Sequence, residues 1–330
     1  MSIKSVLTAA PLRISLLGGG TDFASYYSRS HGAVLSAAID KSVYVHLKVH
    51  DKLFQERYRV SYSTVEHCQR RDEIENDIVR ASLELLDIDL PLQISISADL
   101  PANSGLGSSS SFAVALLLAL HNLRGESVGA SQLAEEACKV EIDILGSPIG
   151  KQDQYSAAYG GFNLYEFFAD GVVKIESIST ETPIVKEIFA NSSMIWTQQT
   201  RKANFVLKDQ EERAEKNLES LSTLKELTYL LRDELKSSNP SKFRVGELIS
   251  SGWRIKQSLS PLILTEDISA LIDEISEMNI LGTKLLGAGA GGFVYCLHDN
   301  FEKEKELIST KWSAFSPVID HQGARILSSN

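Results

Sequence analysis

The sequence lacks any cluster of lysine and arginine, and it holds only three cysteines. Its 33 basic residues are outnumbered by 43 acidic ones, which gives a formal net charge of -10. Binding of DNA or RNA needs a positive surface, so we expect no nucleic-acid partner. Cys68, Cys138 and Cys296 follow neither metal-binding nor redox spacing. We expect them to be buried free thiols without a disulfide.

Long apolar runs are absent as well. The longest, residues 112–120, has nine residues, whereas a membrane-spanning helix needs about 20. The first ten residues show no signal-peptide pattern, so we expect a cytoplasmic protein with no membrane partner. His46 and His50 lie in a predicted strand without carboxylate partners, so no transition-metal site is predicted.

A loop rich in glycine and serine does stand directly before an apolar helix, in PANSGLGSSSSFAVALLLAL at residues 101–120. Gly105 and Gly107 allow a ligand to approach the backbone closely, and the first turn of a helix offers unpaired N–H groups. The pattern therefore indicates a phosphate-binding loop, although a Gly/Ser linker before a core helix is the alternative. Neither the Walker A pattern nor Gly-x-Gly-x-x-Gly is present in this loop.

Three glycines, Gly18 to Gly20, precede Thr21 and Asp22 in PLRISLLGGGTDF at residues 11–23. The glycines would let a ligand reach the main chain, and the carboxylate would accept hydrogen bonds from ligand hydroxyls, as a sugar site requires. The alternative is a hairpin turn in which Asp22 caps a short helix.

The hydrophobic pattern predicts an α+β chain of 330 residues, long enough for two domains or one large one. Strands are predicted over 4–20 with a break at Pro11, over 34–49 as a hairpin turning at Asp40-Lys41, and over 58–62, 90–98 and 194–198. Helices are predicted over 77–86, 112–120, 131–145, 203–236, 243–258 and 266–277.

Taken together, three segments resemble the motifs of the GHMP small-molecule kinases, the superfamily of galactokinase, homoserine kinase and mevalonate kinase. Residues 11–23 are similar to the first motif, residues 101–110 to the second, and KLLGAGAGGFVYCL at 284–297 to the third. Galactokinases have Glu-His where this chain has Gly19-Gly20. The Gly-Gly-Gly-Thr-Asp form instead looks like that of bacterial heptose 7-phosphate kinases and of the kinase part of fucokinases.

The resemblance implies a GHMP kinase fold, an α+β chain whose two halves close on one active-site cleft. It implies an N-terminal domain at 1–190 that binds ATP and phosphate, and a C-terminal domain at 191–330. The implied activity is ATP-dependent phosphorylation of D-glycero-D-manno-heptose 7-phosphate at the anomeric O1. The 1,7-bisphosphate would serve the synthesis of nucleotide-activated heptose for capsule, lipopolysaccharide or other glycans.

Other functions stay open beside this one. They are a fucokinase-like or other GHMP sugar kinase, and a non-catalytic regulator that binds sugar and nucleotide on the same fold. The resemblance implies small-molecule partners, a sugar phosphate and ATP, and gives no oligomeric state.

The resemblance gives catalytic roles to three charged residues. Asp153, within GSPIGKQDQYSAAYGG at 146–161, matches the catalytic base, which would accept the proton of the acceptor hydroxyl and orient its oxygen. Arg13 matches a cation of the first motif that would stabilise Asp153 or the transferring phosphoryl group. Lys151 lies two residues before Asp153, and we include it among the expected catalytic residues.

ATP and Mg2+ are the implied cofactors. Glu141 matches the position of a carboxylate ligand of Mg2+, and the family alignment selects Ser109 as the hydroxyl ligand, with Ser108 and Ser110 open as alternatives. One carboxylate and one hydroxyl suffice for Mg2+, because this cation prefers oxygen ligands and keeps several waters. The residues expected to bind the ATP phosphates are Pro101, Asn103, Ser104, Gly105, Leu106, Gly107, Ser108, Ser109 and Ser110.

A second set of residues is expected to bind the sugar. A substrate with a phosphate on O7 needs an anion site some distance from Asp153, for which Arg29 and the pair Arg201-Lys202 are candidates. Each of these could instead be a solvent-exposed charge. The expected substrate-binding residues are Gly18, Gly19, Gly20, Thr21, Asp22, Arg29, Arg201, Gly289 and Gly291.

Overall fold

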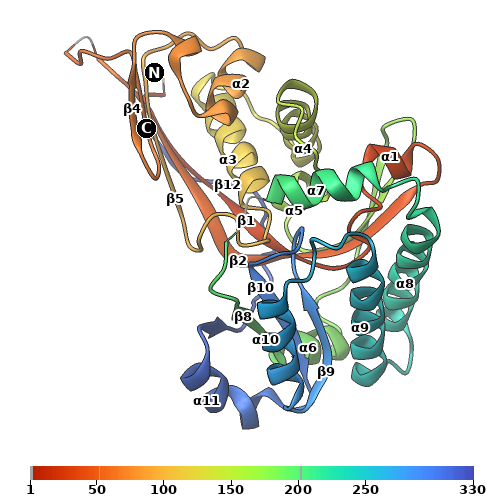
Figure 1. Cartoon of the computed structure of the whole chain (residues 1–330). Coiled ribbons are helices and arrows are strands. Elements are labelled where there is room, and N and C mark those ends of the chain that lie inside the picture. The colour runs from red at the N-terminus through yellow and green to blue at the C-terminus, as the bar shows by residue number, and fades with distance from the viewer. Residues whose placement is uncertain (1–2, 52, 201–202) are drawn as a thin grey trace.

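The computed structural model describes residues 3–51, 53–200 and 203–330, and it contains two β-sheets with helices packed on them (Figure 1). The larger sheet has the strand order β12-β1-β2-β5-β3-β4, with β6 beside β2 and β7 beside β6. Its strands are β1 (Ser5–Leu17), β2 (Gly32–Val49), β3 (Tyr58–Ser61), β4 (Val65–Cys68), β5 (Leu92–Ala98), β6 (Phe162–Phe167), β7 (Val173–Ser177) and β12 (Arg325–Ser329).

The smaller sheet has the order β11-β8-β10-β9 and lies below the larger one in Figure 1. Its strands are β8 (Ser192–Trp196), β9 (Ile280–Leu285), β10 (Phe293–His298) and β11 (Ala314–Phe315). The last strand of the chain, β12, does not join this sheet but pairs with β1, so that Thr8 lies opposite Ile326. The larger sheet is therefore assembled from both ends of the described chain.

Helices pack on both sheets. Those before residue 191 are α1 (Ala24–Tyr27), α2 (Asp77–Leu85), α3 (Ser108–Leu123), α4 (Ala130–Cys138), α5 (Gln152–Tyr159) and α6 (Pro183–Ala190), together with a 3₁₀ turn at Arg71–Glu73 and a π-helical segment at Lys139–Ile144. Those after it are α7 (Ala203–Glu212), α8 (Leu218–Lys236), α9 (Lys242–Ser258), α10 (Glu266–Ser276) and α11 (Phe301–Lys311). Among the described residues, no helix is both long and apolar enough to span a membrane.

Helix α3 is the centre of the larger half. It packs on β1, β2 and α5, and its residues from Ser110 to His121 are all buried, as expected for a helix that is apolar on every side. The prediction of a buried helix after the Gly/Ser loop is confirmed. The three cysteines are also buried free thiols, as predicted.

Two predictions about strands are wrong. Residues 5–17 form one strand that is not broken at Pro11, and residues 32–49 form one strand instead of a hairpin turning at Asp40-Lys41. The register between these two strands shifts between Pro11 and Arg13, opposite residues 38–42. A β-bulge thus accommodates the proline and the polar pair that the sequence alone presented as turn signals.

The predicted helices over 77–86, 243–258 and 266–277 are confirmed within one or two residues as α2, α9 and α10. The stretch 203–236 is instead divided between α7 and α8. The stretch 131–145 changes to a π-helical segment from Lys139 onward, which carries Glu141. Residues 192–196 form the strand predicted near residue 194.

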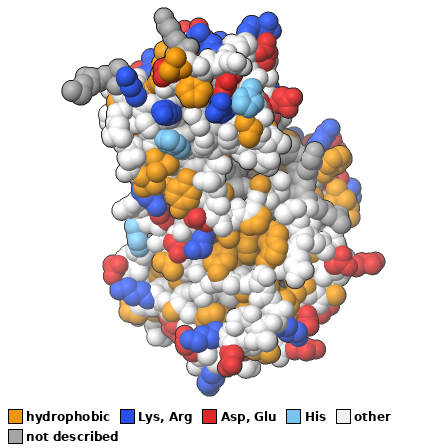
Figure 2. Space-filling model, turned by 90° about the vertical axis from the view of Figure 1, so that its left-hand side faces the viewer, with side chains coloured by type: hydrophobic (Ala, Val, Ile, Leu, Met, Phe, Trp, Pro, Cys, Tyr) orange, Lys and Arg blue, Asp and Glu red, His pale blue; other side chains and the backbone are white. Residues whose placement is uncertain are grey.

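The two sheets meet behind one cavity. Lys284 of β9 donates hydrogen bonds to the carbonyl oxygens of Ser15 (2.6 Å) and Leu16 (2.9 Å) in β1. Helix α9 packs on both β9 and β1 and so joins the two parts. Figure 2 shows that hydrophobic side chains gather at mid-height of one face, with charged side chains of both signs around them.

Candidate active site

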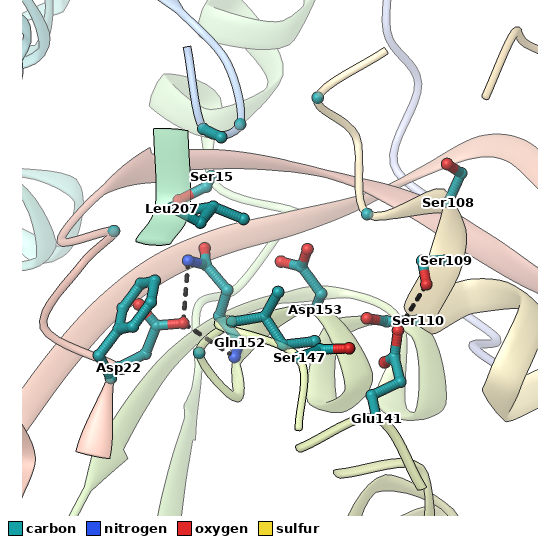
Figure 3. Close-up of a pocket in the computed structure, with 18 of the residues that line it drawn as sticks. Ser15, Asp22, Ser108, Ser109, Ser110, Glu141, Ser147, Gln152, Asp153 and Leu207 are labelled. Carbon is teal, nitrogen blue, oxygen red and sulfur yellow. Dashed lines mark hydrogen bonds between the residues drawn. The ribbon is translucent and has the colours of Figure 1, made fainter. Parts of the chain in front are cut away.

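A cavity of about 310 Å³ lies where β1, the loop before α3, the start of α5 and helix α9 come together. Figure 3 shows Asp22 and Gln152 at one end of it, Ser108 to Ser110 and Glu141 at the other, and Asp153 between them. Helix α7 closes one side through Leu207 and Gln210. One end of the cavity thus has a carboxylate and an amide, and the other has serine hydroxyls and a second carboxylate. The Asp153 carboxylate lies between the two ends.

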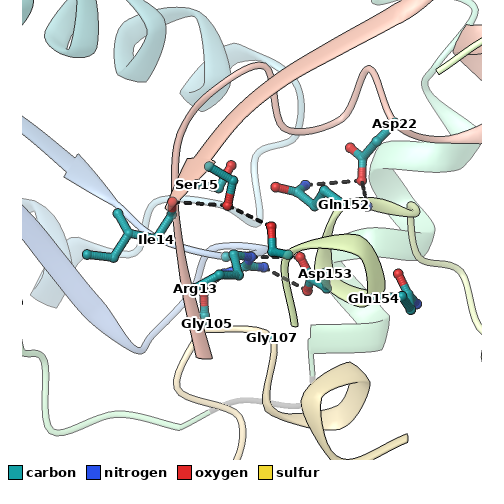
Figure 4. A network of polar contacts seen from close by, with 12 residues as sticks. Arg13, Ile14, Ser15, Asp22, Gly105, Gly107, Gln152, Asp153 and Gln154 are labelled. Carbon is teal, nitrogen blue, oxygen red and sulfur yellow. Dashed lines mark hydrogen bonds and ion pairs between the residues drawn. The ribbon is translucent and has the colours of Figure 1, made fainter. Parts of the chain in front are cut away.

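The central carboxylate is fixed by a buried arginine (Figure 4). Arg13 Nε and Nη2 each donate to one oxygen of Asp153 at 2.7 Å, and Nη1 donates to the carbonyl oxygen of Gly105 at 2.6 Å. The Arg13 side chain is 6% exposed and that of Asp153 is 23% exposed. This bidentate pair holds Asp153 in one orientation and leaves it open to the cavity on one side.

Asp22 is the second carboxylate of the cavity, and it is 1% exposed. Its oxygens accept hydrogen bonds from the backbone N–H of Gly20 (2.9 Å) and from the backbone N–H (3.2 Å) and side-chain amide (3.1 Å) of Gln152. Burial raises the pKa of Asp22, and the nearby charge of Asp153 adds to this effect, while the backbone donors oppose it. Gly150 contacts the carboxylate so closely that a Cβ there would overlap Asp22 Oδ2.

The loop before α3 has the geometry of an anion-binding loop. Gly105 and Gly107 have φ angles of +79° and +77°, which favour glycine, and α3 begins at Ser108. The first helical hydrogen bond from this end runs from Ser111 N to Gly107 O, so the N–H groups of Ser108 to Ser110 have no partner within the helix. A Cβ on Gly107 would lie 3.2 Å from the Asp153 carboxylate, so the loop passes directly beside it.

Glu141 lies next to this helix start and is 2% exposed. Its two oxygens accept hydrogen bonds from Ser109 Oγ (2.6 Å) and from the side-chain amide of Gln154 (2.7 Å). Burial raises the pKa of Glu141, and the hydrogen bonds from Ser109, Ser110 and Gln154 oppose this shift. The carboxylate and the adjacent hydroxyl present the oxygen atoms that Mg2+ prefers.

The predicted phosphate-binding residues divide into two groups. Pro101 is exposed outside the cavity, whereas Ser104 and Leu106 are buried behind the loop. These three residues do not line the cavity, because alternate residues of the loop face the protein interior, and their assignment to phosphate binding stays a prediction. The members that line the cavity are Asn103, Gly105, Gly107, Ser108, Ser109 and Ser110.

The first glycine motif also divides. Gly19, Gly20 and Asp22 line the cavity, but Thr21 does not. The buried Thr21 hydroxyl donates to Gly18 O (2.8 Å) and accepts from the Ala33 backbone N–H (3.0 Å), so it holds the loop in place. Gly18 packs against the Ala33 carbonyl with no room for a Cβ. Gly18 and Thr21 thus support the loop in this structure, and their role in substrate binding stays a prediction.

In the third glycine motif, the cavity is lined by Gly287 and Ala288 instead of the predicted Gly289 and Gly291. The latter two pack against the backbones of Ile263 and Gln199. Their role in substrate binding stays a prediction.

Two predicted cations lie away from the cavity. Lys151 Nζ lies 5.2 Å from the centre of the Tyr27 ring, and the residue does not line the cavity. Arg29 is half exposed and pairs with the exposed Glu215 at 3.3 Å. Neither side chain lines the cavity in this structure, and the predicted roles of Lys151 in catalysis and of Arg29 in substrate binding stay predictions. Arg201 and Lys202 lie outside the described residues.

Lys256 and Gln152 are polar cavity residues that the sequence prediction missed. Lys256 comes from α9 and donates a hydrogen bond to the carbonyl oxygen of Gly287. The pKa of Lys256 is lowered to about 8, because burial and the nearby charge of Arg13 lower it more than Asp22 and Asp153 raise it. Only the family-like segment GWRIKQSLS, at 252–260, pointed to this part of the chain.

Family models match the chain on both sides of this cavity. The model of the GHMP kinase N-terminal domain matches residues 76–161, and that of the GHMP kinase C-terminal domain matches residues 242–312. The chain belongs to the GHMP kinase family. GHMP kinases are ATP-dependent phosphotransferases that act on hydroxyl groups, and the chain is accordingly an enzyme of this class. The predicted GHMP kinase fold is confirmed, and the domain boundary at residue 190 stays a prediction.

Individual relatives include two kinds of sugar kinase. D-glycero-alpha-D-manno-heptose 7-phosphate kinase of Campylobacter jejuni is 27% identical over 314 residues, which are 91% of each chain. Bifunctional fucokinase/GDP-fucose pyrophosphorylase of Arabidopsis thaliana is 29% identical over 220 residues, which are 66% of this chain and 21% of the plant protein.

Solved structures share the fold of this GHMP kinase. A D-glycero-D-manno-heptose 1-phosphate kinase from Bacteroides thetaiotaomicron has a TM-score of 0.77 at 21% identity, covering 98% of this chain and 99% of the other. Galactokinase of Lactococcus lactis, solved with galactose, has a TM-score of 0.74 at 16% identity, covering 97% and 95%.

Proposed function

We propose that this GHMP kinase transfers the γ-phosphoryl group of ATP to the anomeric O1 of D-glycero-D-manno-heptose 7-phosphate and forms the 1,7-bisphosphate. The observation that carries the proposal is the order of groups along one cavity. Asp22 and Gln152 lie at one end, the start of α3 with Glu141 lies at the other, and Asp153 stands between them.

The end with Asp22 suits a polyhydroxylated acceptor. Its carboxylate and the backbone of Gly19 and Gly20 border an open space, and Gln152 Oε1 is a buried acceptor without a hydrogen-bond partner among the described residues. Sugar hydroxyls would donate to these oxygens. The similarity to the heptose 7-phosphate kinase of C. jejuni, which covers 91% of the chain, supports a heptose as the acceptor.

The opposite end suits the phosphates of ATP and Mg2+. The N–H groups of Ser108 to Ser110 and the glycine backbone would bind phosphate oxygens, because a helix N-terminus favours negative charge. Glu141 and Ser109 would hold Mg2+ through oxygen atoms. The described residues contain no cluster of three or more His, Cys, Asp or Glu that could hold a metal, and Mg2+ shared with a nucleotide does not need one. ATP supplies the phosphoryl group when it is bound.

Asp153 would accept the proton of the acceptor hydroxyl and orient its oxygen toward the phosphate end. The two hydrogen bonds from Arg13 fix the direction of this carboxylate. Orientation of the reacting oxygen is a major contribution to phosphoryl transfer, since the protein takes little covalent part in it.

A fucokinase-like activity on an unphosphorylated sugar is the second candidate, and the charge of the cavity favours it. Arg13 and Lys256 are the lysine and arginine side chains that line the cavity in the described part of the chain, and Arg13 is already paired with Asp153. An anion site for a phosphate on O7 is therefore not evident among these residues.

The two candidates differ in their need for the terminal phosphate. The test measures kcat/KM for heptose 7-phosphate, free heptose and L-fucose by ADP release, and locates the new phosphate by ³¹P NMR. The heptose proposal requires a preference of about 10-fold or more for the phosphorylated sugar, as expected for one or more charge-assisted contacts. Equal use of the free and phosphorylated heptose, or phosphorylation away from O1, would contradict it.

A further inference from the structure

Lys256 stands at the junction between the two ends of the cavity. Its Nζ donates to Gly287 O and lies 4.0 Å from the position that a Cβ on Gly19 would take. Gly287 in turn packs so closely on the phosphate loop that a Cβ on it would lie 2.4 Å from Gly105 Cα. The ammonium group thus lies near Gly19, which borders the sugar end of the cavity. It also contacts Gly287, which packs on the phosphate loop.

The ammonium group has hydrogen-bonding capacity that the described protein does not use. An ammonium group has three donors, and Lys256 uses one of them on a carbonyl oxygen. No carboxylate of the described residues lies within ion-pair distance of its Nζ, although the side chain is partly buried in the cavity wall. A partly buried cation without a paired anion is unfavourable, so this position favours an anionic ligand.

Neighbouring charges do not substitute for that ligand. Arg13, from β1, is neutralised by Asp153 of α5, and Lys284, from β9, uses its donors on carbonyl oxygens. Asp22, in the loop after β1, is held by Gly20 and Gln152. These four groups face Lys256 from the elements packed against it, and none forms an ion pair with it in the described structure.

We propose that Lys256 is a catalytic residue that binds the transferring phosphoryl group of ATP, beside Asp153 and opposite the start of α3. A terminal phosphoryl group held by the phosphate loop and directed at Asp153 would pass the junction where Lys256 contacts Gly287. The cation would stabilise the charge on the phosphoryl oxygens during transfer. The inference rests on ATP as the donor and does not depend on which sugar accepts the group.

Nucleotide binding without any sugar tests the proposal. Isothermal titration calorimetry measures Kd for Mg2+-ADP and for Mg2+-AMP-PNP, which differ in the terminal phosphoryl group. Lys256→Met is expected to weaken AMP-PNP binding by about 10-fold or more and to leave ADP binding within twofold, since one charge-assisted contact is lost. Arg254→Met, which removes an exposed cation from the same helix, is the matched control and should change neither Kd.

The pH dependence of nucleotide binding gives a second test, in the wild type and in one conservative variant. Lys256 is protonated below its pKa of about 8, so the preference for AMP-PNP over ADP is expected to be present at pH 7.5 and to fall at pH 9. Lys256→Arg should keep the preference at pH 9, because arginine stays charged. Equal effects of Lys256→Met on both nucleotides, or weaker sugar-phosphate binding with unchanged AMP-PNP binding, would overturn the proposal.

Discussion

Replacement of Asp153 by asparagine separates the chemical role of this carboxylate from its role in the fold. The amide has nearly the same shape, but its nitrogen cannot accept the hydrogen bond that one Asp153 oxygen receives from Arg13 at 2.7 Å. The amide also cannot serve as a base. The substitution therefore removes one hydrogen bond, which an unfolding experiment measures, and the proton acceptor, which a rate assay measures.

The expected effect on stability follows from the lost contact. A hydrogen bond to a charged group contributes about 1.5–3 kcal/mol, and the 23% exposure of the Asp153 side chain places the expected loss near the lower end, about 1.5–2 kcal/mol. Urea unfolding measures this loss as a lower midpoint with an unchanged m-value. The expected effect on catalysis is larger, because loss of a general base reduces kcat by about 10² to 10⁴-fold.

The assay is ADP release at saturating sugar and ATP, at a temperature where the variant is folded. Asp143→Asn is the control, because it removes the same charge from an exposed position on the neighbouring π-helical segment. It should retain wild-type kcat and stability. If Asp153→Asn turned over within tenfold of wild type, Asp153 would not be the base, whatever its effect on unfolding.

Three further variants test the metal and sugar ends. Glu141→Gln should raise the Mg2+ concentration for half-maximal rate and also raise the melting temperature at pH 7. Because burial raises the pKa of Glu141, the stability that its protonated form contributes is present at acidic pH and is lost as pH rises through the folded-state pKa. The gain in the variant should therefore shrink toward pH 4, and a gain independent of pH would contradict this reasoning. Ser109→Ala should raise the Mg2+ requirement severalfold, as measured by titration of the initial rate, and an unchanged requirement would remove Ser109 from the metal site. Gly150→Ala should raise KM for the sugar without changing the Kd of ADP, since the new Cβ would displace the Asp22 carboxylate; an equal loss for both ligands would point to general misfolding.

The sequence predicted the parts of this protein that depend on local order. The Gly/Ser loop, the apolar helix after it and the carboxylate in the segment 146–161 could be recognised because each is continuous in the chain. The same reasoning failed where a partner strand decides the conformation. Asp40-Lys41 has the composition of a turn, yet pairing with β1 and β5 carries the strand through it with a bulge.

Residues that reach the cavity from distant elements were harder to predict. Lys256 is more than 100 residues from Asp153 in sequence, and helix packing alone brings the two into one cavity. In the third glycine motif, the choice between Gly287 and Gly289 depends on which residue meets the phosphate loop. Single-sequence periodicity contains no information on that contact.

The pairing of β12 with β1 bears on the order in which the chain can fold. Residues 325–329 complete an edge of the sheet to which Arg13 belongs, but they leave the ribosome more than 300 residues after their partner strand. Until then β1 has β2 on one side only, and its other edge offers free N–H and C=O groups. Contacts so distant in sequence form slowly, and exposed strand edges promote aggregation. Synthesis of this kinase thus includes a long interval in which a nascent strand that carries an active-site residue remains open to intermolecular pairing.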